Sequence, residues 1–125
     1  MTAQKATIRW SKVIYKEPEN YLAWPTIGKT VDGELLVVFS GDRETHVCPY
    51  GKNQLIRSHD SGATWTKPET INNSPLDDRD TGLLVMDSGN LLITWFTGWG
   101  ISKHATSDPV VSSYIYKYAN AEQYL

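Results

Sequence analysis

The chain has 125 residues, enough for a domain with a hydrophobic core, and its 40% hydrophobic and 21% charged residues exclude a disordered composition. Its net charge of −2 gives no electrostatic reason to expect nucleic acid or an anionic membrane as partner. Cys48 is the only cysteine, which excludes an intrachain disulfide. No apolar run approaches the roughly 18 residues of a membrane helix, and no signal-peptide pattern opens the chain, so the cytoplasm is the favoured location.

Short strands separated by turn residues follow one another along the chain and predict an all-β fold. Two β-like runs come first, at Ala6–Trp10 and Lys12–Tyr15. A third strand, at Pro25–Thr30, leads through an Asp-Gly turn into Leu35–Ser40, whose unbroken apolar run predicts a strand buried on both faces. The remaining predicted elements are strands at Gln54–His59, Thr64–Ile71, Gly82–Met86, Leu91–Thr97 and Val110–Tyr118, and a short C-terminal helix at Tyr118–Leu125.

An internal repeat joins two of the predicted hairpins. The stretch Gly33–Phe39 matches Gly89–Trp95 at an offset of 56 residues, each with a turn, two leucines and an apolar strand that ends in an aromatic residue. A period of this length, built from antiparallel hairpins, is typical of β-propeller blades.

The stretch Ser58-His59-Asp60-Ser61-Gly62-Ala63-Thr64-Trp65 is a turn motif with a mechanical explanation. The Asp60 carboxylate can accept backbone N–H bonds within the turn, and Gly62 can adopt the left-handed backbone conformation. Trp65 is expected to fold back onto the base of the hairpin, while Ser58 and Thr64 are expected to bond across the strand ladder. We therefore expect a structural role for these residues and not a catalytic one: Ser58, Asp60, Gly62, Thr64 and Trp65.

The segments Trp24–Ile27, Asp32–Phe39, Gly41–Arg43 and Arg57–Trp65 together resemble the opening blade of the Asp-box (BNR repeat) sialidase superfamily. The resemblance covers about residues 21–98. It implies a six-bladed β-propeller of antiparallel four-stranded blades, with blade 1 over about 21–72 and blade 2 from about 78. Residues 1–20 could then supply the strand that closes the ring in the last blade. Since six such repeats need about 340 residues, we expect the 125-residue partial propeller to be an N-terminal fragment.

The resemblance also implies hydrolysis of terminal sialic acid, but two positions depart from the family pattern. Ala23 stands where the family has the arginine that holds the substrate carboxylate. The loop after Arg43 carries no aspartate where the family has its acid/base residue. Arg43 itself matches a family arginine, with compressed spacing.

Connections in an antiparallel blade alternate between the two ends of the sheet, so the longer, chemically richer loops should gather at the end opposite the Asp60 turn. We expect Arg43 and Asp80 to lie there within side-chain reach of each other. The alternatives are a structural ion pair of Arg43 with Asp42 or Asp80, and a solvated loop at Asp77–Asp80. The candidate catalytic residues are Asp80, Arg43 and Asp78, and the candidate substrate-binding residues are Arg43, His46, Arg79 and Trp99.

His46 and Cys48 could begin a metal site, but no second pair is spaced to complete it, so we expect neither a metal nor another cofactor. Two functional hypotheses remain. The first is a fragment, itself inactive, of a sialidase-like glycoside hydrolase that acts on terminal sugars of glycans. The second is a non-catalytic propeller module that binds glycan or protein. In both, open blade faces would expose apolar residues and drive self-association; those expected to be uncovered are Leu36, Val38, Leu92 and Trp95.

Overall fold

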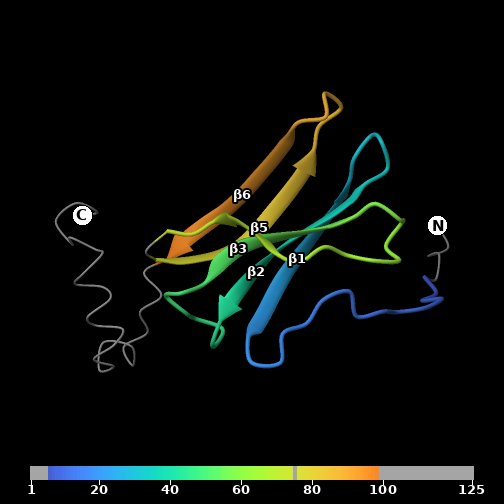
Figure 1. The fold of residues 1–125 in the computed structure, drawn as a ribbon. Helices are drawn as coiled ribbons and strands as arrows, with labels where there is room; N and C mark the ends of the chain where they lie inside the picture. The colour runs from blue at the N-terminus through green and yellow to red at the C-terminus, as the bar shows by residue number, and fades with distance from the viewer. Residues whose placement is uncertain (1–5, 75, 99–125) are drawn as a thin grey trace, which may run out of the picture.

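The computed structural model describes residues 6–74 and 76–98, and all regular secondary structure within them is β (Figure 1). Four strands form an antiparallel sheet in the order β1-β2-β3-β4, and two more form an antiparallel hairpin. The predicted all-β antiparallel architecture is confirmed for this part of the chain. The helix expected at Tyr118–Leu125 and the strand at Val110–Tyr118 lie outside the described residues. The strands are β1 (Tyr21–Lys29), β2 (Leu35–Arg43), β3 (Lys52–Ser58), β4 (Glu69–Asn72), β5 (Asp77–Val85) and β6 (Leu91–Gly98).

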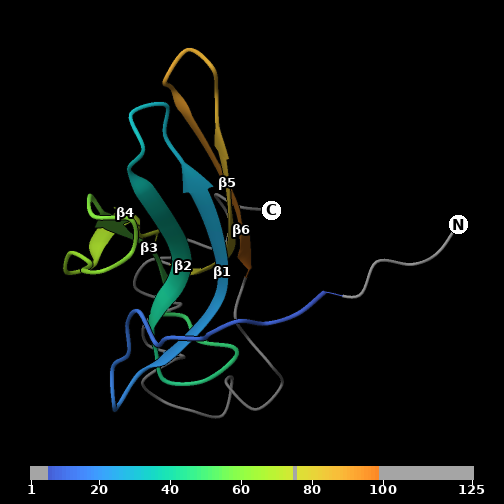
Figure 2. The ribbon, with the colours of Figure 1, turned by 90° about the vertical axis from the view of Figure 1, so that its right-hand side faces the viewer.

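The β5–β6 hairpin lies along one face of the four-stranded sheet, so the described part of the chain forms two β layers (Figure 2). Leu36, Val38 and Leu55 form the buried core between the layers. Because Leu36 and Val38 are completely buried there, the expectation that they are uncovered is wrong. The partly buried residues that pack against them are Ile71, Leu83, Val85, Leu91 and Ile93.

A second apolar cluster lies on the opposite face of the same sheet. Val37, Phe39 and Ile56 form its buried centre. Tyr15 from the segment before β1 packs on it, with its ring centroid 5.9 Å from that of Phe39. Alternate residues of β2 thus enter two different cores, which confirms that this strand is buried on both faces. Leu22 and Trp65 complete the cluster.

The β1–β2 and β5–β6 hairpins are two copies of one structural unit, as the sequence repeat predicted. Each residue pair of the first ladder from Ala23–Ser40 to Lys29–Leu35 recurs in the second after 56 residues. Even the irregularity recurs: the register shift between Ala23 and Thr26 in β1 returns between Arg79 and Gly82 in β5. The pairs Thr26–Val38, Ile27–Val37, Gly28–Leu36 and Lys29–Leu35 correspond to Gly82–Thr94, Leu83–Ile93, Leu84–Leu92 and Val85–Leu91.

The hairpin turns repeat in the same way. Gly33 and Gly89 both have positive φ, 96° and 84°, which costs a glycine no steric clash. The Gly33 N–H donates to the carbonyl of Thr30 at 3.0 Å, and the Gly89 N–H donates to that of Met86 at 2.9 Å. The two turns therefore share their backbone geometry as well as their glycine.

Gly28 allows the two layers to approach closely. A Cβ at this position would lie 2.8 Å from Val85 Cγ2 and 2.9 Å from Leu83 Cδ2. The absence of a side chain at Gly28 lets two side chains of β5 reach the backbone of β1.

Several predicted element boundaries are wrong. Residues 6–20 contain no strand, although strands were predicted at Ala6–Trp10 and Lys12–Tyr15, because they have no strand partner within the described chain. The return strand predicted at Thr64–Ile71 is regular only from Glu69, since the segment before it is bound to the Asp60 turn. The segment Asp77–Asp80, predicted as a loop, is the first part of β5.

Candidate functional site

The Asp60 turn, residues Ser58–Trp65, is held by its own side chains. Asp60 Oδ1 accepts hydrogen bonds from the Thr64 N–H and the Ser58 hydroxyl, both at 2.8 Å, and Oδ2 accepts one from the Thr64 hydroxyl at 2.6 Å. Gly62 has a φ of 90°. The predicted roles of Asp60 and Gly62 are confirmed, whereas Ser58 and Thr64 bond within the turn and not across the ladder.

These hydrogen bonds stabilise the charged form of the Asp60 carboxyl group. The hydroxyl and N–H of Thr64 contribute most, followed by the Ser58 hydroxyl, and they lower the pKa of Asp60 to about 2. Trp65 folds back as predicted, donating from its indole N–H to the carbonyl of Gly62 at 3.1 Å and packing on the second apolar cluster. The turn therefore has a structural role, and its hydrogen bonds favour the ionised form of Asp60.

The sequence-predicted site residues gather at the opposite end of the sheets, which we call the Arg43 end. There β2 finishes at Arg43 and β5 begins at Asp77. The Asp60 turn, in contrast, lies beside the β1–β2 turn, where His59 and Glu34 approach to 3.5 Å. The predicted alternation of loops between the two ends is thus confirmed.

Arg43 pairs with Asp77, and not with Asp42 or Asp80 as the sequence suggested. Arg43 Nη1 lies 2.7 Å from Asp77 Oδ1, and neither side chain has any exposed surface. The guanidinium also donates to the main-chain carbonyls of Asp78 at 3.2 Å and His46 at 2.6 Å. Asp42 instead pairs with Lys52, at 2.6 Å between Nζ and Oδ2. Arg43 therefore ties the loop after β2 to the start of β5.

Asp78 and Arg79 are also committed to contacts within the protein. Asp78 is completely buried, and its carboxylate accepts hydrogen bonds from the N–H of Ser74 at 2.5 Å and the hydroxyl of Thr97 at 2.6 Å. Arg79 pairs with Asp77 and stacks over the Phe96 ring at 5.5 Å. The interactions of Asp78 compete with any role as an acid or base.

Asp80 is the exception, because its side chain is exposed and forms no hydrogen bond or ion pair among the described residues. Its N–H donates to the Ser40 hydroxyl at 3.0 Å. Its φ of 57° belongs to the left-handed region that non-glycine residues rarely adopt. Asp80 lies in the β5 bulge, and Trp24, with a φ of 53°, lies at the corresponding position of the β1 bulge. Such bulges redirect side chains and are frequent next to functional sites.

An aromatic cluster, Tyr21, Trp24 and His46, also lies at the Arg43 end. The Trp24 and His46 ring centroids are 5.0 Å apart, and those of Tyr21 and Trp24 are 6.0 Å apart. The Arg43 guanidinium lies over the Trp24 ring at 5.2 Å. His46 and Tyr21 are exposed and Trp24 is half-buried. The sequence singled out only His46, because the predicted strand began at Pro25 and so left out Tyr21 and Trp24, which are in β1.

Cys48 is buried, and its N–H donates to Asp77 Oδ2 at 3.2 Å. Among residues 6–74 and 76–98, no group of three or more His, Cys, Asp or Glu side chains could hold a metal ion. That part of the chain also contains no helix long and apolar enough to cross a membrane. Trp99, the remaining predicted substrate-binding residue, lies outside the described residues.

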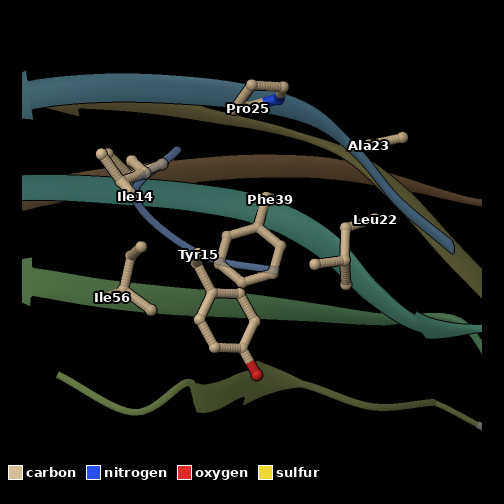
Figure 3. A pocket seen from close by; sticks show the side chains of 8 residues that line it. Ile14, Tyr15, Leu22, Ala23, Pro25, Phe39 and Ile56 are labelled. Carbon is tan, nitrogen blue, oxygen red and sulfur yellow. The ribbon is translucent and has the colours of Figure 1, made fainter. Parts of the chain in front are cut away.

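A pocket of about 220 Å³ lies between the segment before β1 and the second apolar cluster. Figure 3 shows Tyr15 and Ile14 facing Phe39, Ile56 and Leu22 across it. Its lining is almost entirely apolar, so it offers no catalytic group.

No protein-family model matches this sequence, and no curated protein matches it either.

Proposed function

We propose that the two sheets are consecutive blades of a propeller of the Asp-box type, and that the Arg43 end binds the terminal sugars of glycans without cleaving them. The repeated ladder register, the repeated bulge and the face-to-face packing of the β5–β6 hairpin on the four-stranded meander support the proposed fold. The proposed binding surface is the aromatic cluster of Tyr21, Trp24 and His46, with the exposed Asp80 carboxylate at the same end.

The observation that carries a binding role is the burial of two of the three candidate catalytic residues, Arg43 and Asp78; only Asp80 is exposed. Arg43 and Asp78 are completely buried and bonded to other parts of the chain, so a substrate carboxylate or glycosidic oxygen would have to displace those contacts. A buried ion pair of this kind holds structure and is not poised for proton transfer. Ala23, which stands where the resembling family places an arginine, adds no cation.

Aromatic rings suit a sugar because they offer an apolar face to its C–H groups while polar atoms nearby bond its hydroxyls. Trp24 is fixed by the β1 bulge and by the Arg43 guanidinium on its ring, which reduces the ordering cost of binding. The exposed His46 ring stands at 74° to it and adds donor or acceptor nitrogens.

The proposal is tested by titrating the full chain with sialyllactose, lactose and N-acetylneuraminic acid while recording calorimetric heats and tryptophan fluorescence. We expect binding to at least one sugar, weakened about tenfold or more by Trp24→Ala and by His46→Ala. The His46→Ala variant keeps the main-chain carbonyl that accepts from Arg43. Trp10→Ala is the matched control, because Trp10 is 78% exposed and lies outside the cluster. The absence of binding to all three sugars would contradict the proposal.

Asp80 favours a second candidate, hydrolysis of a terminal glycoside. It is an exposed carboxylate, without a side-chain partner among the described residues and held in a strained bulge, which suits a general acid or base. The test measures turnover of a fluorogenic sialoside. This candidate is favoured if the wild type is active, Asp80→Asn is inactive and Asp42→Asn keeps the activity. Sugar binding without turnover would favour the first one.

A further inference from the structure

The contact between the two layers joins two different surfaces. The receiving face, on the four-stranded sheet, carries Gly28, Leu36 and Val38. The inserting face, on the β5–β6 hairpin, carries Leu83, Val85, Leu91 and Ile93. Because the two hairpins are copies of one unit, each hairpin has a surface of both kinds. The layer contact uses the receiving face of the first copy and the inserting face of the second.

Within residues 6–74 and 76–98, no contact uses the receiving face of the second copy. Leu84 and Leu92 occupy the positions of Gly28 and Leu36 in the repeat. They are 56% and 48% exposed, whereas Leu36 is completely buried. The difference arises because β5–β6 covers Leu36, and no described residue covers Leu84 and Leu92 in the same way. An adjacent pair of exposed leucines on a sheet face marks an interaction surface.

The inserting face of the first copy is also incompletely covered. Ile27 and Val37 occupy the positions of Leu83 and Ile93. Ile27 is 62% exposed, whereas Val37 is buried in the second apolar cluster and lines the apolar pocket together with Tyr15. Lys29, at the position of Val85, ends β1 next to the turn and is exposed, so its ammonium group can stay in water while its stem packs.

We propose that these two surfaces bind each other between two copies of this chain, head to tail, with the Ile27 surface of one copy on the Leu84–Leu92 surface of the next. A second copy is the partner because both complementary surfaces are on this chain and their counterparts already pack in its core. The contact is heterologous, so a pair of copies leaves one surface of each kind free. Gly28 has no side chain, whereas Leu84 at the corresponding position of the second hairpin has a bulky one. In the proposed contact Leu84 would face the Ile27 surface, which borders the unfilled apolar pocket.

The test measures the mass of the full chain in solution by light scattering and sedimentation over a wide range of concentration. We expect wild-type association, and we expect Leu84→Glu and Ile27→Glu each to weaken it about tenfold or more. The decisive experiment mixes the two variants. Leu84→Glu keeps its Ile27 surface and Ile27→Glu keeps its Leu84 surface, so the mixture should form a one-to-one complex. Val31→Glu is the control, because Val31 is 78% exposed but lies in the hairpin turn.

A monomeric wild type would overturn the proposal. This includes a monomer in which hydrogen exchange shows that residues 99–125 of the same chain protect β5 and β6. A mixture that stays monomeric while the wild type associates would also overturn it, because it would indicate a symmetric contact. If Leu84→Glu does not fold, as judged by circular dichroism, Leu92→Lys replaces it in the same mixing experiment. Sugar binding at the Arg43 end is measured separately and does not depend on this result.

Discussion

Arg43, the last residue of β2, forms a completely buried ion pair with Asp77, the first residue of β5, with 2.7 Å between Nη1 and Oδ1. Gly51 makes room for this pair, since a Cβ there would lie 2.1 Å from Arg43 Nη1. The pair joins the end of one sheet to the start of the next. We infer that it fixes the relative position of the two layers at the Arg43 end.

Breaking this pair should strongly destabilise the protein. We expect Asp77→Leu to lower the free energy of unfolding by about 3–5 kcal/mol, because it leaves the buried charge of Arg43 uncompensated. Arg43→Met should cost less, because Arg79 still pairs with Asp77. The double variant should recover a large part of that loss, since it removes both charges. Urea denaturation of the four proteins measures the coupling. Lys52→Met, which removes the half-exposed partner of Asp42, is the control and should cost about 1 kcal/mol or less.

The sequence predicted that Arg43 would have a carboxylate partner at this end but named Asp42 or Asp80. Asp77 and Asp78 read as loop residues because aspartate is rare in strands. In the structure their backbones pair with Gly98 and Thr97. Asp77 forms ion pairs with Arg43 and Arg79, and the Asp78 carboxylate accepts hydrogen bonds from hydroxyl groups. Those partners come from distant segments, so no local pattern could reveal them.

The hairpin repeat could be predicted because its turn glycines and leucines recur in the sequence at the same spacing as in the ladder. The aromatic cluster could not. Tyr21 and Trp24 meet His46 only through the pairing of Tyr21 with Arg43 and the bulge that follows it. A bulge adds one residue to one strand and changes which side chains face each other. No residue type near Trp24 indicated a bulge there.

The close approach at Gly28 predicts a steric cost for any side chain there. We expect Gly28→Ala to lower the free energy of unfolding by about 1–3 kcal/mol, because the new Cβ would press on Leu83 and Val85. In a Leu83→Ala background the same substitution should cost less, since one of the two obstructing side chains is gone. Chemical denaturation of the two single variants and the double variant checks this coupling; strictly additive effects would contradict it.

The Asp60 turn predicts a specific loss of stability in acid. The pKa of the Asp60 carboxyl group is lowered from the ordinary 3.8 to about 2 in the folded state. Between these two pH values the folded state therefore binds fewer protons than the unfolded state. The stabilisation is therefore present above about pH 4 and is lost as the pH falls through about 2. Melting temperatures between these limits should fall less steeply for Asp60→Asn than for the wild type. Asp60→Ala should melt lower at neutral pH. Equal slopes for Asp60→Asn and wild type would show that the turn does not depend on the ionised carboxylate.

The raised pKa of Tyr15 predicts a loss of stability in alkali. Burial, followed by its hydrogen bond to Glu17 and the nearby charges of Glu17 and Asp42, raises the pKa of Tyr15 to about 12. Its contribution to stability is complete below pH 10 and is lost as the pH rises through about 12. Ultraviolet titration should resolve one late-titrating tyrosine that disappears in Tyr15→Phe. If the variant keeps that late step, another tyrosine is responsible for it.

The left-handed backbone conformation of Asp80 in the β5 bulge predicts how substitutions at this position change the stability of the protein. A non-glycine residue in the left-handed region costs up to about 1–2 kcal/mol, less for aspartate than for a β-branched residue. We therefore expect Asp80→Val to lower the free energy of unfolding by about 1–2 kcal/mol, and Asp80→Gly to leave it unchanged or raise it slightly, because glycine removes the strain but adds freedom to the unfolded chain. Thermal and urea denaturation measure both effects.

If the exposed Asp80 carboxylate contributes to sugar binding, Asp80→Gly should weaken that binding while keeping full stability, as expected where a strained residue is retained for function. Asp80→Asn separates charge from shape, because asparagine also tolerates the left-handed conformation. If Asp80→Val were more stable than the wild type, the inference that the bulge at Asp80 is strained would be contradicted. Unchanged sugar affinity in both Asp80→Gly and Asp80→Asn would confine the binding surface to Tyr21, Trp24 and His46.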